Sequence, residues 1–557
     1  MCLIYLKEGR HYTAQGLATY VQKLKDSSLT TESNEWYSKL DATSFDERFF
    51  ERLPESINKE FEKSVVKRKN RVFAFHYVGL YDYVDEETGK NLTFFFLPKF
   101  LNIEDGDEVG EDEEEKDNKI WILSDNNLKS WETCCKSFEK YGRDILIQAI
   151  DRYTKEDSRI VDQVEVSEKK HESILELAVR FLRDYLEKGL YIVQRRELEL
   201  NGQGEIDWQT TIDEFQPFIK KGRPYYMDVK TEQAYSDEDH YITRLQKCLV
   251  TTWGRKLEGL GLSSVLRVNV PLLSEEELDQ LGDDDFKIAQ INRELNVQFV
   301  TKSRETLALM KELIQRSAEN KAANYESLSF GMTGVHALWE RACAEVLRTE
   351  LDQEICKCGF ENVQQGVTFS KYMPRVFWTR LTDRQEGDDK GFNEDKKAGW
   401  RLDFIRTWRE DNKVKKLVIL DAKYYCVQWD NNKVSGQPGT QDIAKQMFYQ
   451  MAFYSLIDRK DIVNAFLLPK LEIQKETGRQ EDDDKGGAYS NGIDFTETIT
   501  IGSREKGSVK ETEAFKDIKL FTVRIPGISL LRRYANYDDA NDWFKEIAEF
   551  ATNKGEA

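Results

Sequence analysis

Two acids and a lysine in the last third of the chain have types and spacing suited to chemistry on a phosphate ester. Asp421 and Lys423 end the segment KLVILDAKYY after the apolar run 417–420, and Asp403 lies in the preceding segment WRLDFIRTW. Side chains alternate between the two faces of a strand, so Asp421 and Lys423 share one face. Carboxylates bind Mg²⁺, which activates water and stabilises charge on a phosphoryl group. The set therefore predicts a metal site for phosphodiester hydrolysis.

Each residue of this set has an expected role. Asp403 and Asp421 are the expected metal ligands, with the carbonyl of Ala422 as a candidate third ligand. Lys423 would orient the attacking water or stabilise the transition state. Glu340, on a preceding predicted helix, is expected as an outer acid. Burying an acid and a lysine is costly unless they are paired or hold a metal, so a plain salt-bridge network is the alternative.

Predicted strands and helices position this set. The continuous apolar run 417–420 is typical of a buried central strand, and residues 400–408 predict its neighbour. A helix is expected after Gly334 (VHALWERACAEVL), because its apolar residues recur at the spacing of one helix face. Another helix is expected from about Thr440 (TQDIAKQMFYQMAFYSLI). The expected order is helix, strands, helix.

Two glutamines on the last of these helices are secondary candidates for the site. Gln446 and Gln450 are one helical turn apart, as are Gln450 and Tyr454, so a polar stripe would line the same cleft. The alternative is an amphipathic helix on which both glutamines are exposed to solvent.

A similar set occurs earlier in the chain. Asp207 lies in GEIDW, and Asp228 and Lys230 lie in YYMDVKT, between predicted helices at 171–188 and from about Asp239. The recurring order of helix, three strands and helix suggests an internal duplication. The run before Asp228 is less apolar than 417–420. We expect this copy to be degenerate or structural, and a second active site is the alternative.

Length and pattern predict several domains, because 557 residues exceed what one hydrophobic core organises. Residues 1–165 are expected to form an N-terminal α+β domain with aromatic-rich extended segments. A middle α/β region is expected at 166–271, a charged helical connector at 272–330, and the domain with the acids at 331–557. We therefore expect the α/β fold class, in a protein of several domains that mix helices and strands.

The net charge of −19 would repel a phosphate backbone if it were evenly spread, so any nucleic-acid site must be local. Arginines near the acids are candidates for phosphate contacts. Solvation of strand and helix ends is the favoured interpretation for them. They are Arg375, Arg380, Arg401, Arg406 and Arg409.

Other chemistries have little support. The chain has no GxxxxGK[ST] loop, no Rossmann glycine pattern, no G-x-S-x-G elbow and no CxxC pair, and its eight cysteines are scattered. Any nucleotide hydrolysis therefore belongs to another chain. No apolar run approaches the length of a membrane span, and no secretory signal begins the sequence, so we expect a cytoplasmic protein without membrane contact.

Asp403, Asp421 and Lys423 resemble the catalytic set of the PD-(D/E)xK nuclease superfamily. The wider layout of GEIDW, LWERAC, LDF and ILDAKYY, over roughly 170–460, resembles the LlaJI-type restriction endonuclease family, which is related to McrC in its nuclease part. The resemblance implies a mixed central sheet flanked by helices, and Mg²⁺-dependent cleavage of foreign duplex DNA, with Mn²⁺ as a substitute. It also implies a McrB-like AAA+ GTPase partner.

Two other functions remain open. A DNA-repair exonuclease would use the same residues and would need free DNA ends. A non-catalytic assembly subunit of a defence complex would use them as a salt-bridge network only.

Overall fold

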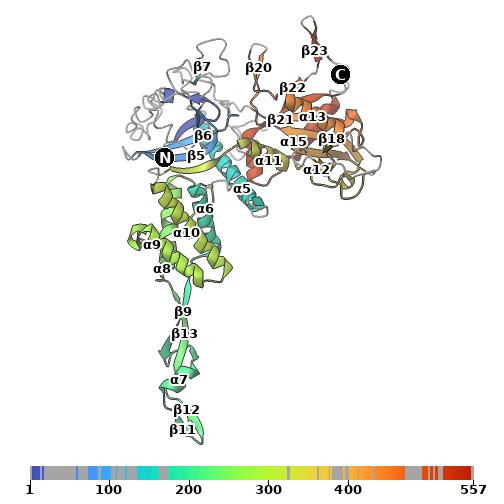
Figure 1. The fold of residues 1–557 in the computed structure, drawn as a ribbon. Coiled ribbons are helices and arrows are strands. Elements are labelled where there is room, and N and C mark those ends of the chain that lie inside the picture. The colour runs from blue at the N-terminus through green and yellow to red at the C-terminus, as the bar shows by residue number, and fades with distance from the viewer. Residues whose placement is uncertain are drawn as a thin grey trace, which may run out of the picture. The chain divides into compact units, whose positions relative to one another are not determined.

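A computed structural model shows a mixture of helices and several sheets (Figure 1). Its contacts divide the chain into two units. Unit 1 comprises Met1, Tyr81–Thr93 and Val166–Phe330, and unit 2 comprises Cys2–Leu80, Phe94–Glu165 and Gly331–Ala557. The structure describes residues 3–12, 73–85, 90–101, 135–161, 173–322, 327–360, 363–374, 400–411, 413–430, 433–470, 492–499 and 518–553, with short pieces at 16–17, 20, 58–60, 108–109, 120–121, 377–378, 393–394, 502–505 and 508–511.

A mixed five-stranded sheet forms the centre of unit 2, in the order β17-β18-β21-β25-β22. β18 pairs antiparallel with β17 and parallel with β21, β21 pairs parallel with β25, and β22 pairs antiparallel with β25. The apolar run of β18 is fully buried, which confirms the expected central strand. The strands are β17 (Phe404–Glu410), β18 (Lys413–Ala422), β21 (Ile462–Lys470), β22 (Asp494–Ile499) and β25 (Leu520–Pro526).

Helices pack on this sheet. On α11 the buried residues recur at helical spacing, as expected, and the indole of its Trp339 donates to the carbonyl of Leu467 on β21. On α13, Tyr449 packs in one core cluster with Leu417 and Ile419 of β18. The helices of unit 2 are α5 (Arg143–Val161), α11 (Val335–Val346), α12 (Phe369–Tyr372), α13 (Thr440–Ala452), α14 (Gly527–Ala535) and α15 (Asn541–Asn553), with 3₁₀ turns η3 (Ile355–Cys358) and η6 (Arg459–Asp461).

Smaller sheets complete the structure. One has the order β1-β6-β5-β14 and another the order β3-β4-β2-β8-β7, and the aromatic-rich segments of the N-terminal part supply strands to both, as expected. Outside unit 1, the pairs β15 with β16, β19 with β20, and β23 with β24 form two-stranded ribbons. The bounds are β1 (Leu3–Lys7), β2 (His11–Tyr12), β3 (Asn58–Glu60), β4 (Phe73–Phe75), β5 (Tyr77–Asp85), β6 (Lys90–Leu97), β7 (Glu108–Val109), β8 (Ile120–Trp121), β14 (Ser327–Thr333), β15 (Phe377–Trp378), β16 (Asn393–Glu394), β19 (Gln428–Asp430), β20 (Lys433–Ser435), β23 (Gly502–Glu505) and β24 (Ser508–Glu511).

Unit 1 contains a group of packed helices. A capping box formed by Ser173 and Glu176 begins α6, and Gly189, with a φ of 79°, ends it. α10 packs against α6 and α9, and its Leu307, Met310 and Leu313 are fully buried. The helical prediction for the charged region is thus confirmed. The helices are α6 (Ile174–Lys188), α8 (Tyr241–Gly259), η2 (Leu278–Leu281), α9 (Asp284–Val297) and α10 (Thr301–Ala322).

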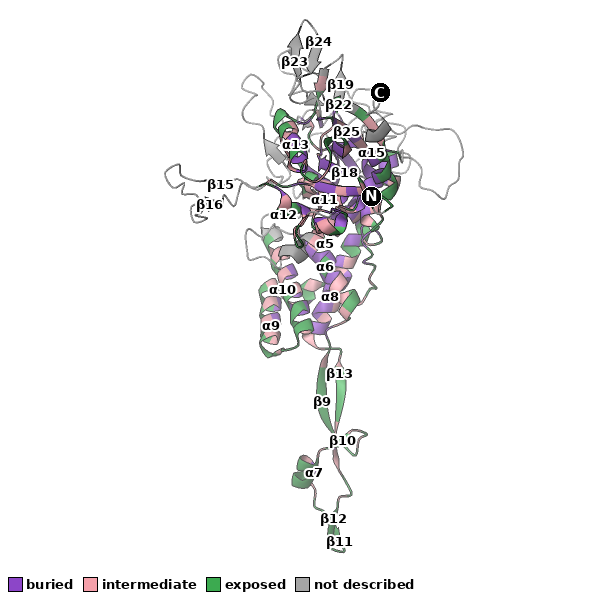
Figure 2. Ribbon diagram, turned by 90° about the vertical axis from the view of Figure 1, so that its right-hand side faces the viewer, coloured by how far each residue is buried: buried purple, intermediate pink, exposed green. Residues whose placement is uncertain are grey.

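A narrow arm extends from these helices of unit 1 (Figure 2). Its long strands β9 and β13 pair antiparallel along their whole length, and β9 is almost entirely exposed. Because both faces of the pair meet solvent, it forms a ribbon rather than the centre of a packed domain. The arm consists of β9 (Val193–Leu200), β10 (Glu205–Ile206), α7 (Trp208–Glu214), β11 (Phe218–Lys220), β12 (Arg223–Tyr225) and β13 (Lys230–Asp237).

The arm overturns the element order on which the duplication hypothesis rested. Between α6 and α8 the chain forms five strands and a short helix instead of three strands. The charged residues of β9 (VQRRELEL) leave no continuous apolar face to bury, so the segment does not fold as a central sheet. The division of the sequence into four domains remains a prediction. Over the residues that the structure describes, no helix is long and apolar enough to cross a membrane.

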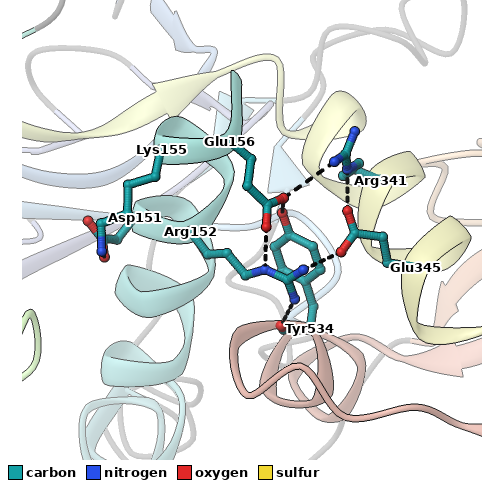
Figure 3. Close-up of polar contacts among 7 residues, drawn as sticks. All are labelled: Asp151, Arg152, Lys155, Glu156, Arg341, Glu345 and Tyr534. Atoms are coloured by element: carbon teal, nitrogen blue, oxygen red, sulfur yellow. Dashed lines mark hydrogen bonds and ion pairs between the residues drawn. The ribbon is translucent and has the colours of Figure 1, made fainter. Parts of the chain in front are cut away.

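An ion-pair network connects α5 with α11 and α14 within unit 2 (Figure 3). The Arg152 guanidinium lies 2.8 Å from Glu156, contacts Glu345 of α11, and donates to the carbonyl of Tyr534 on α14. Arg341 of α11 also pairs with Glu345 and lies 3.5 Å from Glu156. Only 11% of the Arg152 side chain is exposed, so these partners are needed to offset the cost of burying its charge.

We predict that Arg152→Met lowers the free energy of unfolding by about 2 kcal/mol, because two partly buried carboxylates lose a partner. Lys155→Met on the same helix is the matched control. Lys155 is 47% exposed and pairs with Asp151 at 2.9 Å on the surface of α5, so its loss should cost under about 0.5 kcal/mol. Urea denaturation of the full chain measures both, and equal losses would contradict a role for the network.

Candidate active site

Strand β18 carries Asp421 into the interior of unit 2. The side chain is 1% exposed and lies on the strand face of Leu417 and Ile419, which α13 covers. In the ladder Phe404 of β17 stands opposite Leu420. One step further along this antiparallel register brings Asp403 opposite Asp421. The sequence prediction that these two acids converge is therefore confirmed.

The two carboxylates influence each other strongly. Burial raises the pKa of the Asp403 carboxyl, and the neighbouring carboxylate of Asp421 raises it further. Two adjacent carboxylates cannot both be ionised at low cost without a cation. A proton or a cation would therefore stabilise this pair of acids.

Lys423 lies beside the acids, just beyond the end of β18. Its Nζ is 2.9 Å from Oδ2 of Asp421 and 3.9 Å from Oδ1 of Asp442, and its backbone N–H donates to Leu467 on β21. Burial opposes the charged form of Lys423, but the contacts with Asp421 outweigh burial and raise its pKa. The ammonium is thus charged and held at the carboxylates.

Glu340 of α11 faces the same place. It is half-buried, and burial raises the pKa of its carboxyl, whereas Lys423 lowers it and Asp421 raises it. Glu340 and Asp403 line a cavity of about 370 Å³. The other lining residues are Tyr153, Glu156, Ala337, Arg341, Ala344, Arg401 and Leu402. Glu340, the outer acid expected from the sequence, thus shares a cavity with Asp403.

The acids fit a divalent metal ion. Oδ1 of Asp421 and Oδ2 of Asp403 are buried without a hydrogen bond, and Oδ2 of Asp421 makes only the ion pair with Lys423. Such oxygens are costly unless something positive contacts them. Within the described part of the chain no three Asp, Glu, His or Cys side chains are grouped for metal binding. Two carboxylates nevertheless suit Mg²⁺, which keeps several waters.

Gln446 and Gln450 anchor α13 to β21. Gln446 Nε2 donates to the carbonyl of Ala465, and Asn464 Nδ2 donates to Oε1 of Gln450 and to the backbone carbonyl of Gln446. Both glutamines are at most 1% exposed, so the alternative that they face solvent is wrong. The contacts that the structure gives these amides are structural, and their catalytic assignment remains a prediction.

A neighbouring stripe of α13 contacts the acid set instead. Asp442 lies near Lys423, and the hydroxyl of Tyr449 donates to the carbonyl of Arg401, two residues before Asp403. Lys445 stands over the Tyr449 ring, 5.5 Å from its centroid, and its charge acts on Glu340. Sequence reasoning missed these residues. Their i, i+3 and i+7 spacing is a detectable signal, displaced by one residue from the glutamine stripe.

The five arginines considered for phosphate contact differ in their surroundings. Arg406 donates to the carbonyl of Leu347 and to Asn541, and Arg409 pairs with Glu350, so both have structural partners. Arg401 lines the cavity. Arg375 and Arg380 lie outside the described residues.

The earlier acidic set does not form a comparable site. Asp207 caps the N-terminus of α7 by accepting from the backbone of Gln209 and Thr210. Asp228 lies before β13, accepts from Asn201 and is exposed, and Lys230 pairs with Glu214 at 3.3 Å. Asp228 and Lys230 do not share one strand face as Asp421 and Lys423 were expected to, because β13 begins only at Lys230. These contacts are structural ones.

We predict that Asn464→Leu lowers the free energy of unfolding by about 2 kcal/mol, because Oε1 of Gln450 is left buried without a donor. The double variant Asn464→Leu with Gln450→Leu should recover part of this loss, since both polar partners are then replaced by apolar groups. Chemical denaturation of the two variants and of Gln450→Leu alone measures the coupling. Strictly additive losses would show that the two amides do not interact.

Comparison with known proteins places these elements in a family. The sequence model of the LlaJI restriction endonuclease family matches residues 77–478, which include α11, β17, β18, α13 and the arm. The type II restriction enzyme BsuMI component YdjA of Bacillus subtilis (strain 168) is 30% identical over 282 residues. That alignment covers 50% of this chain and 55% of the relative, so the chain spans about half the length of this relative.

Two solved structures resemble the chain weakly. The refined half-complex of Thermococcus gammatolerans McrB AAA+ hexamers with bound McrC matches with a TM-score of 0.31 at 14% identity, over 96% of this chain and 99% of that one. The Thermococcus gammatolerans McrBC complex matches with a TM-score of 0.21 at 15% identity, over 56% of this chain and 80% of that one. These scores are too low for any function to be transferred.

Proposed function

The chain belongs to the LlaJI restriction endonuclease family, and from this premise we propose that it is the metal-dependent DNA endonuclease subunit of a bacterial restriction system. The substrate would be foreign duplex DNA, and the reaction hydrolysis of its phosphodiester bonds. One observation carries the proposal. Asp403 and Asp421 meet at the end of a buried strand with Lys423 beside them, and their buried oxygens lack donors.

Each residue has a part in the proposed reaction. Asp403 and Asp421 would hold Mg²⁺, or Mn²⁺ in its place, and the carbonyl of Ala422 is a further candidate ligand. A divalent ion supplies an activated water and neutralises charge on the phosphoryl group. Lys423, held by Asp421 and Asp442, would orient that water and stabilise the transition state. Glu340 would act from the outer rim as a proton acceptor.

The surrounding elements support a PD-(D/E)xK nuclease core. Asp421 lies in β18, Asp403 directly precedes β17 and Lys423 directly follows β18, so the set lies at one end of this antiparallel strand pair, next to the parallel strand β21. α11 precedes the pair and α13 follows it. This order is the one that the resemblance implied for a mixed sheet flanked by helices.

We also propose a McrB-like AAA+ GTPase as partner, docked on the arm of unit 1. The chain has no phosphate-binding loop of its own. The tip of the arm exposes apolar side chains, with Phe218 at 68%, Ile219 at 71% and Met227 at 85% exposure. A cluster of exposed apolar residues marks a surface for protein contact. The arm therefore offers the partner a site separate from the acid set in sequence.

We predict that Asp421→Asn and Lys423→Ala each reduce cleavage of closed circular DNA at least about 100-fold. The reaction contains Mg²⁺, the neighbouring GTPase subunit and GTP. Asp285→Asn is the matched control, because Asp285 is an exposed acid of α9 outside both the arm and the acid set, and this variant should cleave at the wild-type rate.

The rival functions give different results in the same assay. Cleavage of linear DNA only would favour a repair exonuclease. No cleavage by the wild type, together with no Mn²⁺ binding by calorimetry, would favour an assembly subunit. Wild-type cleavage by Asp421→Asn would remove the acid set from the reaction.

We predict that Phe218→Ser with Ile219→Ser abolishes binding of the GTPase subunit, measured by size-exclusion chromatography, and leaves Mn²⁺ binding unchanged. Phe299→Ser is the control, because Phe299 is 86% exposed in unit 1 but lies outside the arm. Removal of apolar area at a docking surface weakens association. Undiminished complex formation by the arm variant would place the partner elsewhere.

A further inference from the structure

The cavity beside Asp403 is lined by more acidic than basic side chains. Its acids are Glu156, Glu340 and Asp403, and its cations are Arg341 and Arg401. Asp421 adds a further carboxylate next to Asp403. An anionic substrate can approach such a place only where cations face it.

The ion-pair network assigns one of these cations to a structural role. Arg341 pairs with Glu345 and lies 3.5 Å from Glu156, as Figure 3 shows. Glu156 is also bound by Arg152 at 2.8 Å. The network therefore neutralises Glu156, which would otherwise repel a phosphate, and in doing so it uses the charge of Arg341.

Arg401 is in a different situation. Its side chain is exposed, and among the residues that the structure describes it has no ion pair. Its backbone is nevertheless held in place. The carbonyl accepts from the Tyr449 hydroxyl, Leu402 is 5% exposed, and the ring of Trp400 stacks on Phe448 with centroids 4.3 Å apart. The exposed Arg401 side chain, with no ion pair to any described residue, thus extends from an anchored backbone.

The position of Arg401 suits a phosphate close to the proposed metal. It lies two residues from Asp403 and lines the same cavity as Asp403 and Glu340. A guanidinium presents donors in a planar fork that matches the oxygens of a phosphate. Arg406 and Arg409, which have structural partners, cannot serve this purpose without breaking those contacts.

We propose that Arg401 binds a backbone phosphate of the DNA strand in this cavity and so positions the strand at Asp403 and Asp421. The inference rests on the proposed nuclease function and adds a substrate-binding residue to it. The α5 helix, through Tyr153 and Glu156, then forms one wall of the DNA-binding cavity. Residues before 165 therefore contribute to the substrate site.

The test measures DNA binding separately from cleavage. A fluorescein-labelled 30-base-pair duplex is titrated in Ca²⁺ at several salt concentrations, with wild type, Arg401→Ala, Arg401→Lys and Lys415→Ala. Lys415 is an exposed cation on β18, six residues from Asp421, and about 20 Å away along the strand. It therefore controls for the loss of one positive charge.

Arg401→Ala should weaken binding about ten-fold and reduce the salt slope by about 0.9, the value for one lost phosphate contact. Arg401→Lys should keep the salt slope, because the charge remains. Its cleavage with Mg²⁺ and the GTPase subunit should fall at least about ten-fold, because an ammonium lacks the planar fork. Lys415→Ala should match the wild type in both measurements.

The outcomes separate this inference from the proposed function. If Arg401→Ala cleaves DNA as fast as the wild type and its salt slope is unchanged, the role of Arg401 is overturned and the nuclease function stands. An Arg401-dependent slope without cleavage by the wild type would overturn the nuclease function and leave the phosphate contact standing. A wild type that neither binds nor cleaves DNA would overturn both.

Discussion

The meeting of two carboxylates at the end of a buried strand is the constraint on which the site depends. Asp421 is 1% exposed, and Asp403 directly precedes Phe404, which pairs with Leu420 at the end of the β17–β18 ladder. In water each acid would be ionised, but side by side in the interior they need a proton or a cation. Lys423 neutralises one oxygen of Asp421 and leaves others without donors. Keeping these oxygens buried is therefore costly, and in the proposed function a divalent ion would contact them.

The rotation of α13 decides which of its residues serve the site. Gln446 and Gln450 turn toward β21 and use their amides to fix the helix on the sheet. That anchoring directs Asp442 toward Lys423 and Tyr449 toward the segment before Asp403. These buried hydrogen bonds would be lost if the helix turned, so they favour one orientation of α13. By fixing the helix, the two glutamines thereby place the charge of Asp442 beside Lys423.

The α5–α11–α14 network has a comparable role for the cavity. Arg152 and Arg341 pair with Glu156 and so neutralise its charge. Glu340 and Asp403 also line the cavity, but the network gives neither of them an ion pair. Arg401 is then the lining cation with no ion pair among the described residues. The charge pattern in the cavity is therefore set by contacts that are distant in sequence, such as that between Arg152 and Tyr534.

The sequence by itself determined the buried strand 417–420, the helices around it and the convergence of Asp403, Asp421 and Lys423. Alternation along a strand and helical periodicity are local properties, and neighbouring strands tend to pair. The sequence did not reveal that GEIDW and YYMDVKT form an exposed arm, because motif spacing says nothing about burial. Nor did it reveal which stripe of α13 faces the acids, or that Arg401 rather than Arg406 lines the cavity. Those choices depend on packing between distant elements, where one residue of helix rotation exchanges one side chain for another, and only the tertiary structure decided them.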